Sequence, residues 1–82
     1  MKKYYKWIEE KRTIHNLNID ADGLEICVHQ YVGCGEQWYL SVNRLDITQL
    51  DLETTDLEVA KCSAIEFVRS YVQNLLAELG KI

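Results

Sequence analysis

The sequence predicts an α+β fold in which an antiparallel meander of three to four strands is covered by one long C-terminal helix. In the middle of the chain, apolar and polar residues alternate, as they do in strands with one buried face. Toward the end, apolar residues recur at spacings of three and four, as they do along one side of a helix. A one-sided helix and a one-faced sheet bury their apolar surfaces by packing together.

Length and composition indicate a single domain. The 82 residues, 48% hydrophobic and 27% charged, allow one core of ordinary globular composition. We divide the chain into a basic N-terminal segment at 1–12, a sheet at 13–53 and a helix at 56–79. The chain has no apolar run long enough to cross a membrane and no apolar stretch behind its basic start, so we expect a cytoplasmic protein.

The first twelve residues fit either a short helix or an edge strand. Tyr4, Trp7 and Ile8 have helical spacing, whereas Tyr5 and Trp7 alternate as they would in a strand. No turn-forming residue interrupts this segment, and for that reason we favour a short N-terminal helix.

The central strands follow from alternation and turns. In LEICVHQYV, the apolar residues Leu24, Ile26 and Val28 alternate with more polar ones, and Asp22-Gly23 before them is a tight-turn pair. After Gly33 and Gly35, the next strand places a second apolar set on one side: Trp38, Leu40 and Val42.

A short run at residues 45–52 would be the fourth strand, and the predicted count of three to four strands leaves it open. Its apolar alternation slips between Ile47 and Leu50, which a β-bulge or a turn near Thr48-Gln49 would explain.

The C-terminal helix is the clearest element. Its apolar stripe runs from Leu57 to Leu79, a length of about six turns. Thr55 followed by Glu58 predicts a capping box at the N-terminus, and Gly80 predicts a left-handed residue at the C-terminus.

The candidate metal-binding and catalytic residues do not form a known motif. Three cysteines are an odd number for a disulfide framework, and Cys27, His29, Cys34 and Cys62 lack the paired spacing of a structural zinc site. An enzyme using Cys34 as nucleophile would need a base, for which only His15 and His29 are candidates, and an orienting third group. We therefore expect a protein with no enzymatic activity, no metal and no cofactor.

Charge is distributed unevenly along the chain. Residues 1–12 carry +3 and the remaining residues carry −7, for a net charge of −4. An acidic body disfavours direct binding to nucleic acid, which depends on Lys and Arg neutralising phosphates.

The segment LDITQLDLETTDLEVA, residues 45–60, holds five carboxylates and no Lys or Arg. Asp56 and Glu58 are explained by the helix start, where negative charge is favourable. Asp46, Asp51 and Glu53 precede the helix and have no such explanation. Solvated surface charge is one reading of these three; the other is a surface for a protein partner with a basic groove.

We expect Asp46, Asp51 and Glu53 to be the principal partner contacts, with Asp56 and Tyr39 as secondary ones. Tyr39 is included because the inward parity of Trp38 turns its neighbour outward, and an exposed Tyr is a common interface anchor.

The order of a small β-meander, an acidic connector and a helix beginning TTDLEVAKCSA resembles the small accessory proteins of phages and mobile elements, among them anti-CRISPR inhibitors. The resemblance covers most of the chain and is one of architecture. It implies a stoichiometric inhibitor, acting in the cytoplasm of a bacterial host, that occupies a nucleic-acid-binding surface of a defence protein.

Two alternatives remain open. The run EQWYLSVNRLDI followed by a capped helix is similar to the sheet-to-helix half of HicB-like antitoxins, although their usual proline-glycine turn is missing here. The other alternative is a structural or regulatory module that forms a homodimer through a sheet edge or a helix flank at Val59 and Phe67.

Overall fold

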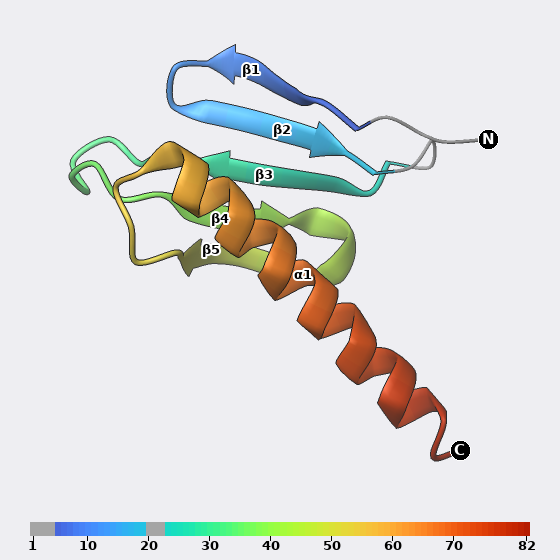
Figure 1. Cartoon of the computed structure of the whole chain (residues 1–82). Coiled ribbons are helices and arrows are strands. Elements are labelled where there is room, and N and C mark those ends of the chain that lie inside the picture. The colour runs from blue at the N-terminus through green and yellow to red at the C-terminus, as the bar shows by residue number, and fades with distance from the viewer. Residues whose placement is uncertain (1–4, 20–22) are drawn as a thin grey trace.

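The computed structural model describes residues 5–19 and 23–82, which form one antiparallel sheet of five strands followed by a long helix (Figure 1). The strands neighbour one another in chain order, β1-β2-β3-β4-β5. The elements are β1 (Trp7–Lys11), β2 (Ile14–Asn18), β3 (Glu25–His29), β4 (Tyr39–Val42), the short 3-10 helix η1 (Asn43–Leu45), β5 (Ile47–Asp51) and α1 (Leu57–Leu79). The α+β meander is confirmed, whereas the expected count of three to four strands is too low.

The N-terminal segment is a strand and not the short helix that we favoured. β1 pairs antiparallel with β2, with Trp7 opposite Leu17 and Ile8 opposite Asn16. Trp7 packs against the core while Ile8 stays 55% exposed, which is the alternation of an edge strand. Pairing with a neighbouring strand gives this segment hydrogen bonds and a place for Trp7, whereas an isolated helix this short is marginal in water. Residues 1–4 lie outside the described part of the chain.

One face of the sheet and one side of the helix form the core. In β3 and β4 the inward residues are those predicted by alternation, and Val28, Leu40 and Val42 are fully buried. The helix contributes Ala60 and Ala64, both with no exposed surface. Two alanines four residues apart lie on the same side of a helix, and their small size lets α1 approach the sheet closely.

The strand β5 is irregular, as its sequence predicted. The register between β4 and β5 shifts between Leu40 and Val42, and Gln49 has a φ of 54°. Ile47 is therefore buried and Leu50 half-buried, although they are three residues apart. The left-handed residue at Gln49 restores the inward direction that a regular strand would have lost.

The ends of α1 differ from the predicted caps. Its N-cap is Asp56, one residue after the expected Thr55, and Gly80 has φ −66° and ψ −13°, which is right-handed. Asp56 forms the cap because a carboxylate oxygen reaches the free backbone N–H groups of the first turn. Of the predicted turn pair, Asp22 lies outside the described residues, while Gly23 has a φ of 94°.

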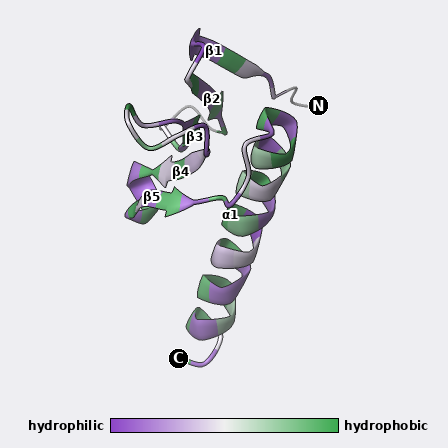
Figure 2. Ribbon diagram, turned by 90° about the vertical axis from the view of Figure 1, so that its left-hand side faces the viewer, coloured by the Kyte–Doolittle hydropathy of each residue, from purple (hydrophilic) through white to green (hydrophobic). Residues whose placement is uncertain are grey.

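The C-terminal part of α1 extends past the edge of the sheet (Figures 1 and 2). Its buried residues, Ala60, Ala64 and Val68, all belong to the first half of the helix. Across residues 5–19 and 23–82, no helix has both the length and the apolarity needed to cross a bilayer.

Candidate functional site

The predicted acidic residues lie around β5 and the connector that leads to α1. Asp46 directly precedes β5, Asp51 ends it, and Glu53 and Asp56 belong to the connector. All four side chains are exposed. β5 separates Asp46 from Asp51 by about 15 Å, given the usual rise per strand residue. The structure therefore places Asp51, Glu53 and Asp56 at one end of the molecule, here named the acidic end, and leaves Asp46 at the other end of the strand.

Asp51 has a structural role besides its charge. Its Oδ1 accepts a hydrogen bond from the backbone N–H of Glu53 at 2.7 Å. Glu53 itself has a φ of 57°, a left-handed conformation in which the local hydrogen bond holds the chain. Gln37 Nε2 lies 3.5 Å from each carboxylate oxygen of Asp51. Asp51 therefore fixes the turn that presents Glu53.

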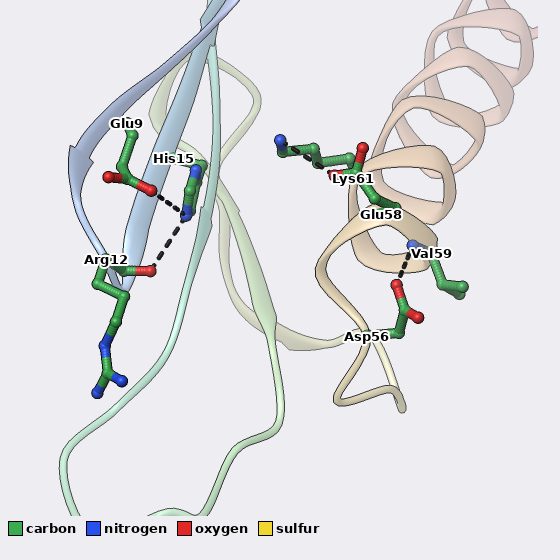
Figure 3. A network of polar contacts seen from close by, with 7 residues as sticks. All are labelled: Glu9, Arg12, His15, Asp56, Glu58, Val59 and Lys61. Atoms are coloured by element: carbon green, nitrogen blue, oxygen red, sulfur yellow. Dashed lines mark hydrogen bonds and ion pairs between the residues drawn. The ribbon is translucent and has the colours of Figure 1, made fainter.

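Asp56 is likewise held by the backbone around it. Its Oδ1 accepts the N–H of Val59 at 3.1 Å, as Figure 3 shows, and its own N–H donates to Thr54 Oγ1 at 3.1 Å. In the first turn, Glu58 forms an ion pair with Lys61 at 3.2 Å (Figure 3). Both acidic residues therefore have structural roles at the helix start, although Asp56 takes the capping position expected of Thr55 and Glu58 pairs with Lys61.

The connector is fastened to the start of β4 by Trp38. The Trp38 backbone N–H donates to the carbonyl of Thr54, and its carbonyl accepts from the N–H of Leu52, both at 3.0 Å. Its indole N–H donates to the carbonyl of Thr55 at 3.1 Å. The carboxylates of the acidic end therefore project from a segment with fixed backbone geometry.

Within the described residues, the carboxylates that form ion pairs are those of Glu9, Glu58, Glu66 and Glu78. None of the four predicted acidic contacts is paired with a Lys, Arg or His of this same part of the chain. Their negative charge is therefore presented to the solvent, as a surface for a basic partner requires.

Tyr39 lies on the face of the sheet opposite to α1. It is half-buried and pairs across the strands with Asp51, so it adjoins the acidic end. Its ring stacks on that of His29 with centroids 6.4 Å apart and meets the edge of Tyr31 at 4.9 Å. Partial burial, followed by the neighbouring Cys34, Asp51 and Tyr31, raises the pKa of the Tyr39 hydroxyl. Tyr39 therefore lies on the outward face of β4, as expected, where it belongs to an aromatic group with His29 and Tyr31.

The possible metal ligands are divided between the two layers. Cys27 and His29 share the uncovered face of β3, Cys34 is exposed in the following loop, and Cys62 is exposed on α1. In residues 5–19 and 23–82, no three His, Cys, Asp or Glu side chains come close enough to hold a metal.

The hydrogen bond between Ser41 and His29 was missed by sequence reasoning. Ser41 Oγ and His29 Nε2 lie 2.8 Å apart, and burial lowers the pKa of His29. The pair arises because His29 lies opposite Tyr39 and Cys27 opposite Ser41 in the β3–β4 register. Strand register of this kind depends on pairing between distant segments, which the pattern of one strand does not report.

A second histidine, His15, is buried with 4% of its surface exposed. Its Nε2 lies 3.1 Å from the carbonyl oxygen of Arg12 and 3.8 Å from Glu9 Oε1, as Figure 3 shows. Its ring meets Trp38 edge-on at 5.6 Å. The alternation of β2 could have revealed it, because His15 has the same parity as the buried Leu17. Its burial and its contacts with Arg12 and Trp38 indicate that His15 is a structural residue of β2.

Comparisons of this chain with models of protein families, with curated proteins and with solved structures found no match. A function is therefore to be inferred from the surfaces of the chain itself. Of these, the acidic end combines exposure, unneutralised charge and a fixed backbone.

Proposed function

We propose that this chain is a non-enzymatic inhibitor that binds another protein through its acidic end and Asp46. The partner would present a basic surface that otherwise binds nucleic acid. The observation that carries the proposal is the exposure of Asp51, Glu53 and Asp56, without a cation partner in the described chain, on a connector fixed by Trp38.

A fixed set of carboxylates suits this role for two reasons. Opposite charges accelerate encounter with a basic groove and fix the orientation of the complex. Because the Asp51 and Asp56 side chains are already held by backbone N–H groups, little conformational freedom is lost on binding. Tyr39, which is adjacent to Asp51 across the strands, supplies an aromatic contact beside the charges.

Inhibition follows from competition. Lys and Arg side chains that bind phosphates would be occupied by carboxylates, so the partner could not hold nucleic acid at the same time. The architectural resemblance to phage accessory proteins suggests a bacterial defence protein as the target. Such binding should weaken as the salt concentration rises, because screening reduces the attraction between exposed charges.

The test is a capture experiment with two charge-matched variants. The first, D46N/D51N/E53Q/D56N, removes four charges, while the amide groups introduced at positions 51 and 56 retain a side-chain oxygen for the turn and the helix cap. The control, E10Q/E25Q/E66Q/E78Q, removes four charges from exposed residues elsewhere and has the same net charge.

We expect the immobilised wild type and the control variant to capture the same basic nucleic-acid-binding protein from a bacterial lysate. The D46N/D51N/E53Q/D56N variant should lose this capture with its far-UV circular dichroism unchanged. Nucleic acid added to the lysate should compete with the wild type for that protein. Equal capture by both variants would show that the acidic end is not the binding surface.

A further inference from the structure

We propose that two copies of this chain pair antiparallel through the C-terminal half of α1. The relevant residues continue the apolar stripe of the helix beyond the sheet. Their spacing alternates between four and three residues, as in a coiled-coil seam. In order they are Val68, Val72, Leu75 and Leu79 on the helix, followed by Ile82, which lies three residues beyond the end of α1.

Burial declines along this seam as the helix leaves the sheet. Val68 is 7% exposed and Val72 is half-buried, whereas Leu75, Leu79 and Ile82 are 44%, 63% and 100% exposed. Figure 2 shows hydrophobic positions continuing along the turns of α1 that extend past the sheet. The apolar side that the sheet covers in the first half of α1 is therefore uncovered in the second half.

The exposed area matches the requirement of a small dimer. Together with Leu76, which is 63% exposed beside the seam, these side chains expose on the order of 500 Å² per copy. Pairing two copies can remove at most about 1,000 Å² from water, which is the lower limit for a specific protein interface. An apolar patch of this size on a monomer commonly marks an interaction site.

Charge favours a second copy at this position. The chain carries −4 overall, but residues 65–82 hold two acidic and two basic residues and are neutral. These form the pairs Glu66–Arg69 and Glu78–Lys81 within the helix. Two copies therefore meet here without the repulsion that their acidic ends would cause.

Geometry selects the antiparallel arrangement. The seam is continuous with the side of α1 that faces its own sheet, so a parallel partner helix would run into that sheet. An antiparallel partner overlaps only the part beyond the sheet, and a two-fold axis beside Ala77 brings Leu75 opposite Leu79. The same residues then serve both copies, as an isologous contact requires.

The test is the mass in solution under reducing conditions, measured by sedimentation equilibrium from about 5 to about 500 µM, a range suited to a contact near the lower size limit. We expect the average mass to rise with concentration from the 9.6 kDa of the monomer toward twice that value. The L75Q/L79Q variant should remain at the monomer mass throughout, with a thermal midpoint close to that of the wild type at low concentration.

A matched control is I8Q/V32Q, which replaces two apolar residues that are also exposed, at 55% and 104%, but lie far from the seam. It should dimerise like the wild type. A wild-type mass of 9.6 kDa at every concentration would overturn the proposal, as would a dimer that persists in L75Q/L79Q.

Discussion

Trp38 donates its indole N–H to the carbonyl of Thr55 at 3.1 Å, and this bond ties the start of β4 to the connector between β5 and α1. Trp38 precedes β4, and Thr55 precedes the cap of α1. Because Trp38 is also only 5% exposed, one residue fills the core and fixes the connector that carries the acidic end. Stability and the presentation of charge are therefore coupled at this position.

Replacing Trp38 by Phe should lower the free energy of unfolding by about 1–3 kcal/mol. The change removes the indole donor and leaves a small cavity, while the ring itself remains apolar. Urea denaturation followed by far-UV circular dichroism measures the effect. The control is Trp7→Phe at the half-buried edge strand, which should cost less; an equal or larger loss there would contradict the central role of Trp38.

The pH dependence of stability should include a contribution from His29. Burial lowers its pKa in the folded protein below the ordinary value of 6.5. Between the folded pKa and 6.5, the unfolded chain binds more protons than the folded one, so stability falls as the pH drops through this window. Above pH 6.5 both states are neutral and the contribution is constant.

The measurement is a proton NMR titration of the two histidine rings, with His29→Gln used to assign the signals. We expect the His29 ring to titrate below pH 6.5. The urea midpoint of the wild type should decline from about pH 7 to about pH 5 more steeply than that of His29→Gln. A His29 ring that titrates above 6.5 would show that its charged form is favoured by folding.

The three thiols should differ in reactivity. Burial, followed by the negative charges of Glu25 and Glu10, raises the pKa of Cys27 to about 11, whereas Cys34 and Cys62 are exposed. A thiolate is the reactive form, and the raised pKa of Cys27 lowers its thiolate fraction at pH 8. We expect Cys27 to react with a disulfide reagent at least about tenfold more slowly than either exposed cysteine.

Two variants separate the thiols. C34S/C62S retains only Cys27 and should show the slow phase alone, while C27S should show only fast reaction. Fast labelling of C34S/C62S in its folded state would mean that the uncovered face of the sheet does not shield Cys27.

Much of the fold is local in origin and could be predicted. Ile26 and Val28 are separated by one residue that points to the other face, as are Leu40 and Val42, and this spacing defines strands with one buried face. The helical spacing of Ala60 and Ala64 defines the side of α1 that packs on these strands. The irregularity in β5 was also visible, because Ile47 and Leu50 have opposite strand parity. These signals depend only on the geometry of a single strand or helix.

The candidate site was predicted only in part. The exposure of Asp46, Asp51, Glu53 and Asp56 agrees with expectation, since short runs of charge usually face water. Their division into an acidic end and a separate Asp46 depends on the path of β5, and the contact of Tyr39 with His29 depends on the register of two strands. Neither can be derived from spacing along the chain.

The sequence by itself determined which residues are buried and whether their spacing is that of a strand or of a helix. The reason is that side-chain direction follows from backbone geometry. Only the tertiary structure decided the remainder. Residues 7–11 became a strand because β2 offered a partner, and α1 proved longer than the sheet that it covers. Both outcomes depend on contacts between segments that are distant in the chain. The free energy of such contacts cannot be estimated from the local propensities of one segment.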